Sequence, residues 1–301
     1  MTAASVSLTD LEQKVAAGTP FTRADAERLM ASVDLIRIGM LGQTARQRRA
    51  NDEVTFLRVT LVSGGVVPDD RGDPGEVRLM SLPHTVEAAL AHVERASAFA
   101  AGTPVSGYGV TELLDLSGHD RAGLADVAAR LRGAGLEAVA EFEIDAFETT
   151  EEAVDVGEAI ERGGLGVWRL TVGRAGPSDR LALIERASEL SRALRTVRAF
   201  APLPRHDAPE SPSTGYDDVR TIAAARLLCE QIAAIQVDWP LYGPKLAQVA
   251  LAYGANDIDG VSAVDDPELG ARRAPRQDIV RQIQAANCVP VERNGRGERR
   301  P

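Results

Sequence analysis

The sequence predicts an α/β fold built on a parallel sheet. Between residues 53 and 204, short runs of β-branched and apolar residues alternate with amphipathic helical segments, and this alternation is typical of βαβ units. A length of 301 residues, with 44% hydrophobic and 26% charged side chains, suits a single domain over residues 1–301 with one large core. Right-handed crossovers between parallel strands allow either an open doubly wound sheet or a barrel.

Residues 8–50 are predicted to be helical. Leu29, Ile36 and Met40 belong to a set of apolar residues that recur at helical spacing. Thr22, just after the Gly-Thr-Pro break at residues 18–20, is a candidate N-cap. These helices precede the first strand.

Six strands are predicted within residues 53–204, at 53–63, 77–83, 103–110, 136–144, 165–172 and 194–203. Residues 64–76 are rich in Gly, Pro and Asp and predict an irregular loop. A polar, Pro-containing connection then leads to a long helical pattern at 218–236, so residues 205–294 are expected to form a helical C-terminal region. The basic residues 295–301 are expected to be a frayed tail.

Composition and charge exclude several classes of function. A net charge of -10 argues against binding to nucleic acid, and the basic cluster Arg46, Arg48 and Arg49 is expected to be a solvated helix end. The N-terminus shows no signal-peptide pattern, and no run approaches the roughly 18 apolar residues of a membrane helix, so a cytoplasmic protein is expected. Cys229 and Cys288 are far apart and make neither a disulfide framework nor a CxxC metal motif, so no metal site is expected.

A resemblance to a known family lies mainly in the C-terminal third. The segment AARLLCEQIAAIQVDWPLYGPKLAQVALAYGANDIDGVSAVDD, followed by VPVERN, resembles the shared C-terminal region of aminofutalosine synthase, dehypoxanthine futalosine cyclase and the deazaflavin F0 synthases. These are radical S-adenosylmethionine enzymes of menaquinone and deazaflavin biosynthesis. The residues on the family's motif positions are Trp239, Gln248, Gly254, Ala255, Asp257, Asp259, Gly260, Pro290, Glu292 and Arg293.

The resemblance also implies an architecture. Residues 32–59 and 183–204 are similar to the family's entry helix with its first strand and to its sixth strand, so the resemblance covers most of the chain. It implies a partial (βα)6 TIM-type barrel over residues 53–204, with N-terminal helices and a helical C-terminal extension.

The chain departs from the family where relatives bind their cofactors. Relatives carry CxxxCxxC in the loop after the first strand, but residues 64–76 contain no Cys, and iron-sulfur clusters need thiolate ligands. The sequence AEFEID stands where relatives have GGG, and Val261 replaces their Thr. The expectation is therefore no cluster, no cofactor, and weakened binding of S-adenosylmethionine.

Three acidic residues at period 2 are candidate catalytic groups. Glu141, Glu143 and Asp145 fall on one face near the end of a predicted strand, where barrel active sites lie. They could do acid-base chemistry or bind a hard cation. The structural alternative is that they form ion pairs with Arg169 or Arg198.

Arg169, on the predicted strand 165–172, is a candidate ligand-binding residue, and two further groups are candidates as well. Tyr108 and Glu112 lie in SGYGVTELLDL, which resembles a substrate-side stretch of the family; the alternative is a glutamate favoured by a helix N-terminus. Asn256, Asp257 and Asp259 could anchor a polar ligand from the ANDIDG loop, but Asn, Asp and Gly also form ordinary turns.

Histidines could titrate near neutrality at a barrel mouth. His206 follows the last predicted strand and is a further catalytic candidate, and His84 follows the second. The alternative for both is a solvated loop side chain. His119 and His92 are weaker candidates.

Two functional hypotheses follow. The first is a pseudoenzyme of the futalosine pathway that binds a pathway enzyme, a second copy of itself or a small-molecule intermediate; it predicts an exposed apolar patch and a filled barrel mouth. The second is a non-radical hydrolase or lyase acting on a nucleoside or aromatic acid; it predicts an open pocket with Glu and His of perturbed pKa.

Overall fold

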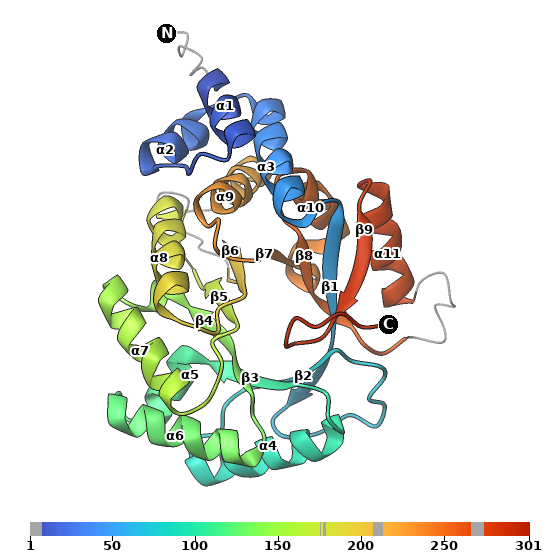
Figure 1. Ribbon diagram of the computed structural model, residues 1–301. Coiled ribbons are helices and arrows are strands. Elements are labelled where there is room, and N and C mark those ends of the chain that lie inside the picture. Colours follow the sequence, from blue (N-terminus) through green and yellow to red (C-terminus); the bar gives the residue numbers. More distant parts are fainter. Residues whose placement is uncertain (1–7, 175, 177–178, 207–212, 266–273) are drawn as a thin grey trace.

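Eight parallel strands close into a barrel in the computed structural model, which describes residues 8–174, 176, 179–206, 213–265 and 274–301 (Figure 1). Neighbours in the barrel follow chain order, and β1 pairs with both β2 and β8 to complete the ring. The barrel strands are β1 (Glu53–Ser63), β2 (Glu76–Met80), β3 (Val105–Gly109), β4 (Ala138–Glu143), β5 (Arg169–Val172), β6 (Ala199–Pro204), β7 (Ala234–Asp238) and β8 (Asp257–Ser262).

The length of β1 explains how one more strand joins the sheet outside the barrel. Its second half pairs with β2, with Val59 opposite Glu76. Its first half pairs in parallel with β9 (Val289–Arg293), with Glu53 opposite Val289. The 11 residues of β1 therefore hold both the barrel seam and an outer strand.

The α/β barrel is confirmed, but the six-stranded partial barrel is replaced by a closed ring of eight strands. The region 205–294 is not wholly helical, because β7, β8 and β9 lie within it. The helical pattern predicted at 218–236 ends at Leu228, and its last residues enter β7. The sequence of β8, DIDGVS, looks like a turn because its two carboxylates and Gly are unusual in a strand. Arginines from distant strands make this strand stable.

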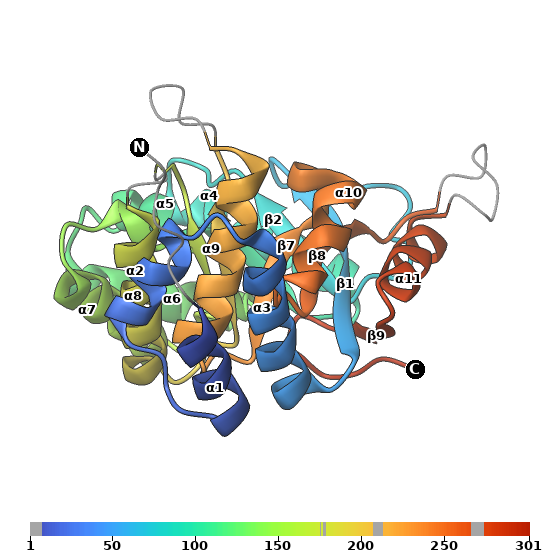
Figure 2. The ribbon, with the colours of Figure 1, turned by 90° about the horizontal axis from the view of Figure 1, so that it is seen from above.

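The predicted N-terminal helices are α1 (Thr9–Ala17), α2 (Arg23–Ala31) and α3 (Leu35–Ala50). Thr22 caps α2 as predicted: its hydroxyl accepts a hydrogen bond from the Asp25 N–H at 3.3 Å, and the Asp25 carboxylate accepts one from the Thr22 N–H at 2.8 Å. Figures 1 and 2 show these helices as an outer layer, in which α3 packs on α9 and α2 contacts α8 and α9.

The other helices surround the barrel and bury its outer face. They are α4 (Val86–Ala100), α5 (Val110–Leu116), α6 (Arg121–Ala134), α7 (Thr150–Arg162), α8 (Arg180–Ala193), α9 (Gly215–Leu228), α10 (Trp239–Ala252) and α11 (Pro275–Ala285), with a 3-10 turn at Ile144–Ala146. Apolar side chains such as Val93, Leu131, Ile160 and Ile222 fill the layer between helices and strands. In the described part of the chain, no helix combines the length and apolar character that crossing a membrane requires.

The residues after β9 turn back on themselves. The Asn294 N–H donates to the Glu298 carbonyl at 2.9 Å, and Arg293 forms an antiparallel bridge with Arg299. The sequence predicted a frayed end over residues 295–301. In the structure this tail makes ion pairs with the barrel, including Arg296 with Glu137 at 2.7 Å.

Candidate functional site

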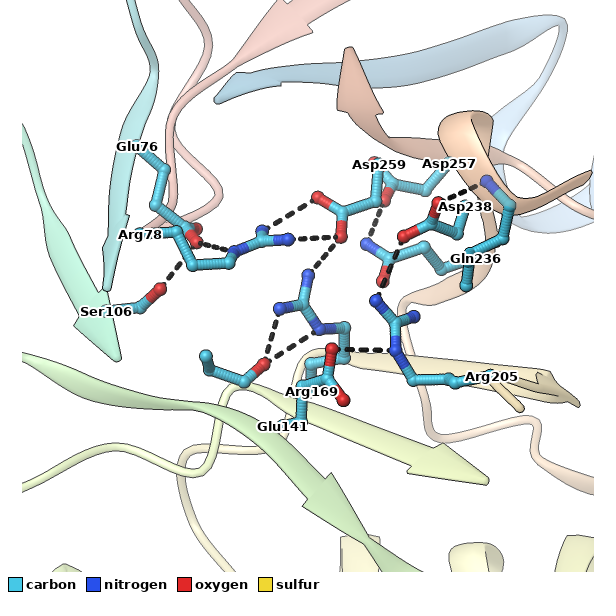
Figure 3. Close-up of polar contacts among 12 residues, drawn as sticks. Glu76, Arg78, Ser106, Glu141, Arg169, Arg205, Gln236, Asp238, Asp257 and Asp259 are labelled. Atoms are coloured by element: carbon cyan, nitrogen blue, oxygen red, sulfur yellow. Dashed lines mark hydrogen bonds and ion pairs between the residues drawn. The ribbon is translucent and has the colours of Figure 1, made fainter. Parts of the chain in front are cut away.

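The interior of the barrel is unusually polar. Strand side chains alternate between the two faces of a sheet, and three strands each direct two polar residues inward: Glu76 and Arg78 on β2, Gln236 and Asp238 on β7, and Asp257 and Asp259 on β8 (Figure 3). Barrels of this type normally fill the interior with branched apolar side chains. The polar interior therefore marks a candidate site.

Asp259 is the centre of this network. Its two carboxylate oxygens each accept a hydrogen bond from Arg78 at 3.0 Å, and it also pairs with Arg169. Burial by itself would raise the pKa of Asp259, but the charges of Arg169 and Arg78 outweigh it and hold the pKa well below its usual value. Asp259 is therefore ionised at neutral pH and acts as a structural anion.

Glu76 extends the network along β2. Its carboxylate accepts hydrogen bonds from Arg78 at 2.8 Å and from the Ser106 hydroxyl at 2.6 Å. Arg78 thus contacts two carboxylates. Arg169 also donates a hydrogen bond to the Ala140 carbonyl at 3.1 Å. These contacts form a layer of charge across the barrel, the Arg78–Asp259–Arg169 layer.

Asp257 lies one inward position before Asp259 on β8 and nearer the amino ends of the strands. It accepts two hydrogen bonds from Arg293 at 2.6 and 2.7 Å and one from Gln236 Nε2 at 2.6 Å, and it also accepts one from Thr55. These donors lie on β1, β7 and β9, and β1 and β7 are the two neighbours of β8 in the sheet. Asp257 therefore joins these strands and has a structural role.

A third group of charges lies toward the carboxyl ends of the strands. Arg205 pairs with Glu141 at 2.7 Å and with Asp238 at 3.0 Å. Asp238 also caps α10 by accepting the Leu241 N–H at 3.0 Å. The structural alternative predicted from the sequence was that the β4 carboxylates form ion pairs with Arg169 or Arg198. In the structure, Glu141 pairs with Arg205 instead.

A pocket of about 570 Å³ opens above this group, at the carboxyl ends of the strands where active sites of such barrels are built. Its charged lining contains Arg78, Glu141, Arg205 and Asp238, and its apolar lining includes Leu61, Met80 and Leu241. We call this the mouth pocket. The filled mouth predicted for a pseudoenzyme is therefore absent from the described residues.

Glu143 differs from the other carboxylates. It is partly buried, and it accepts a hydrogen bond from the Thr111 hydroxyl at 3.2 Å. Burial raises the pKa of Glu143, and the negative charge of Glu141 raises it further. Glu143 therefore holds its proton at higher pH than an ordinary glutamate does.

Asp145 and His206 have other positions. The Asp145 carboxylate accepts the N–H groups of Gly173 and Arg174 at 2.6 and 2.8 Å, so it ties the loop after β5 to the end of β4. The His206 side chain is exposed, and its backbone N–H donates to the Gly173 carbonyl at 2.9 Å. Asp207, its neighbour, lies outside the described residues.

Tyr108 and Glu112 lie beside β4 at the end of β3. The Glu112 carboxylate accepts the N–H of Gly109 at 2.7 Å and of Leu82 at 3.1 Å, which favours a structural role. Tyr108 has a left-handed backbone, with φ of 64°, and its buried hydroxyl finds no hydrogen-bond partner among the described residues. Burial raises the pKa of Tyr108, and the charge of Glu112 adds to this effect.

Of the predicted ANDIDG residues, Asn256 is separated from the two aspartates. Its Oδ1 accepts the Ile235 N–H at 2.9 Å and its Nδ2 donates to the Ala233 carbonyl at 3.1 Å, so it joins the starts of β7 and β8. Sequence reasoning missed Arg78 and Arg205. Arg78 stood in an apolar strand pattern two residues after Glu76, a period-2 signal for an inward ion pair.

Cysteines and metal ligands are sparse. The two cysteines, Cys229 after α9 and Cys288 before β9, are both buried, and burial raises the pKa of Cys229 to about 12. In the ranges that the structure describes, no three His, Cys, Asp or Glu side chains are grouped as metal ligands.

The fold and site define an α/β-barrel protein with a charged interior and a pocket at the carboxyl ends of its strands. No family model matches the chain. It is 26% identical to aminodeoxyfutalosine synthase of Streptomyces coelicolor over 96% of this chain and 93% of that protein. It is 30% identical to cyclic dehypoxanthine futalosine synthase of the same organism over 31% of this chain and 24% of that protein. The predicted resemblance is confirmed: this chain is a relative of these futalosine enzymes.

Solved structures agree on the fold. Methylornithine synthase superposes with a TM-score of 0.63 at 13% identity, over 93% of this chain and 97% of that one. The FeFe-hydrogenase maturase HydG from Carboxydothermus hydrogenoformans superposes with a TM-score of 0.60 at 10% identity, over 94% of this chain and 79% of that one. At such identities the likeness concerns the barrel alone.

Proposed function

We propose that this chain is a pseudoenzyme related to the futalosine enzymes, one that holds no iron-sulfur cluster and binds a small-molecule intermediate of that pathway in its mouth pocket. The cysteine content of the sequence supports the absence of an iron-sulfur cluster. A four-iron four-sulfur cluster that binds S-adenosylmethionine needs three thiolates in one loop, whereas residues 64–76 contain none and the whole sequence has two cysteines. The residues present do not fit the cluster.

The pairing of the mouth charges supports a binding role. Glu141 and Asp238 share Arg205, and Asp259 is held by Arg78 and Arg169. The two arginine charges hold the pKa of Asp259 well below its usual value, so Asp259 is a weak base. Arg205 engages Glu141 and Asp238 in ion pairs, so these groups suit recognition of a polar ligand better than proton transfer.

The dimensions of the mouth pocket support the ligand class. A volume of about 570 Å³ lies within the usual range for small-molecule sites, which is about 300–1,000 Å³. A lining that combines apolar residues such as Leu61, Met80 and Leu241 with charged residues suits a nucleoside with one apolar side and several hydroxyl groups. Aminodeoxyfutalosine, named by the S. coelicolor relative, is such a compound.

The test combines iron analysis with calorimetry. After anaerobic reconstitution with iron and sulfide, we expect no stoichiometric cluster and no cleavage of S-adenosylmethionine. Titration with aminodeoxyfutalosine should show one site, weakened about tenfold or more by Arg205→Gln, because a hydrogen bond to a charged group is lost. The exposed control Arg162→Gln, whose charge pairs with Glu158 at 3.8 Å, should bind as the wild type does.

Leu241→Trp keeps all the ion pairs of the mouth pocket and narrows it from its rim, so it serves if Arg205→Gln does not fold. Loss of binding in this variant supports the proposal. A stoichiometric cluster with cleavage of S-adenosylmethionine contradicts it, and so does ligand binding that neither variant changes.

A second candidate function, a non-radical hydrolase or lyase, is favoured by the open mouth pocket, which this hypothesis predicts, and by Glu143. A raised pKa suits a general acid, and Thr111 orients the carboxyl group. If this function holds, turnover of aminodeoxyfutalosine is detectable by chromatography, and Glu143→Gln lowers it by about 100-fold. Absence of turnover in the wild type, together with binding at the mouth pocket, leaves the pseudoenzyme as the better account.

A further inference from the structure

A second cavity, of about 280 Å³, lies at the amino ends of the strands. It shares no lining residue with the mouth pocket, and the Arg78–Asp259–Arg169 layer lies between the two. The tail residues Gly295, Arg296 and Gly297 form part of its wall. We propose that this basal cavity binds a small organic carboxylate that carries a hydrogen-bond donor, as a site separate from the mouth pocket.

Charge is the first argument. The lining of the basal cavity includes the cations Arg169, Arg198, Arg293 and Arg296, against the single carboxylate of Glu76. Three of these arginines have carboxylate partners of their own, which are Asp259, Asp257 and Glu137. The lining therefore carries an excess of positive charge.

Arg198 accounts for that excess. Among the described residues no carboxylate forms a salt bridge with it; it lies over the Trp168 ring at 5.1 Å and donates to the Arg296 carbonyl. Burial lowers the pKa of Arg198, and the charge of Arg293 lowers it further. A half-buried cation beside other cations gains from an anion. The guanidinium of Arg198 is thus the expected anchor for a carboxylate.

Gln236 supplies the second requirement. Its side chain is only 2% exposed and lines the basal cavity. Its Nε2 donates to Asp257 at 2.6 Å, whereas its Oε1 has no hydrogen-bond partner among the described residues. Leaving a buried acceptor unpaired is costly, so the ligand should offer an O–H or N–H to this oxygen.

The remaining walls indicate a carboxylate rather than phosphate. Leu57, Val139 and Trp168 give the cavity an apolar side, which suits a carbon skeleton and offers nothing to the outer oxygens of a phosphate group. The volume of about 280 Å³ lies just below the usual range for small-molecule sites, so the ligand must be compact. A compact hydroxy acid or amino acid fits both conditions.

The tail closes the basal cavity by close backbone contact. The Gly295 N–H donates to the Gly75 carbonyl at 3.0 Å. A Cβ on Gly75 would lie 2.5 Å from the backbone carbonyl oxygen of Arg293, so glycine at position 75 lets the chain after β9 approach so closely. Arg300 fastens the end of the tail to Glu292 at 2.7 Å. The wall of the cavity is therefore held in place by backbone contacts and an ion pair of the folded chain.

Calorimetry with matched probes tests the proposal on the full chain. Lactate and mandelate carry the hydroxyl group; propionate and phenylacetate lack it, and inorganic phosphate lacks the carbon skeleton. We expect at least one hydroxy acid to bind at one site, more tightly than its matched partner and than phosphate. Arg198→Gln should weaken this binding about tenfold or more. Arg195→Gln, an exposed charge three residues away, is the matched control and should change nothing.

Gln236→Met removes the unpaired acceptor at nearly constant volume. This substitution should abolish the preference for the hydroxy acid over its matched partner. The preference measures the interaction between the ligand hydroxyl group and Gln236 Oε1, which the variant lacks. Leu241→Trp, at the mouth pocket, should leave the binding intact. The proposal is overturned if no hydroxy acid binds up to its solubility limit, if phosphate binds as tightly, or if Arg198→Gln has no effect.

Discussion

At the scale of single residues, Asp259 shows what the polar interior of the barrel costs and what keeps it stable. Its side chain has no exposed surface, and it neutralises two buried arginines, Arg78 and Arg169. Removing water from three charged groups is unfavourable, and only their mutual attraction and hydrogen bonds compensate for it. The stability of this cluster depends on all three members being present.

We therefore expect Asp259→Asn to lower the free energy of unfolding by about 3–5 kcal/mol, because it leaves buried guanidinium charge without compensation. Urea denaturation followed by circular dichroism at neutral pH measures this change. The matched control is Asp155→Asn, which breaks the exposed pair with Arg121 at 2.8 Å; it should cost less than about 1 kcal/mol. Equal effects of the two substitutions would contradict the role given to Asp259.

At the scale of elements, the contact of α3 with the end of α10 depends on a missing side chain. A Cβ on Gly42, within α3, would lie 2.2 Å from the carbonyl oxygen of Tyr253 and 2.6 Å from its carbonyl carbon. Backbone atoms cannot move aside as the end of a flexible side chain can. Gly42 therefore sets the distance between the outer helical layer and the barrel.

Gly42→Ala is expected to destabilise the protein by about 1–3 kcal/mol through overpacking. Gly133, near the end of α6, has no neighbouring atom within 4 Å of the place where an alanine Cβ would lie, and Gly133→Ala should raise stability by up to about 1 kcal/mol through lower backbone entropy in the unfolded chain. Thermal unfolding of the two variants compares the signs directly. A stable Gly42→Ala variant would show that α3 does not pack as described.

At the scale of the whole molecule, stability depends on carboxylates that are hydrogen-bonded to cations. Asp25 is buried and Asp73 is exposed, and the hydrogen-bonded cations Lys14 and Arg300 outweigh the desolvation of the two carboxylates, so both pKa values fall below the usual 3.8. The pKa of Asp259 is lowered as well. Groups of this kind favour folding when they are ionised, and the benefit disappears as they become protonated.

The free energy of unfolding should therefore be nearly constant at neutral pH and fall steeply as the pH drops below about 4, where unfolded aspartates take up protons first. The direction of this change follows because a carboxylate whose pKa is lower in the folded state stabilises the protein at pH values above its unfolded-state pKa. Urea titrations across a pH series measure it. The Asp259→Asn variant should lose less stability over the acid range than the wild type, and an equal loss in both would contradict this assignment.

Local patterns in the sequence were sufficient for part of the fold. Short runs of β-branched and apolar residues predicted the first six strands, and helical repeats predicted the N-terminal helices and the Thr22 cap, because those signals lie within a few residues of one another. The ordered C-terminal motif also established the relationship to the futalosine enzymes. The carboxylates of Asp257 and Asp259 were recognised as important residues, although they were assigned to a loop.

Tertiary structure alone decided the closure of the barrel, the strand character of DIDGVS, and the pairing of Arg78 with Asp259 and of Arg205 with Glu141. Each depends on residues far apart in the sequence or on strands that meet only when the ring closes, so no local pattern encodes it. The sequence by itself determined the alternation of strands and helices and showed that residues 64–76 contain no cysteine. The closed barrel decided which charges neutralise each other, because attraction between buried ions depends on distance in space rather than in the chain.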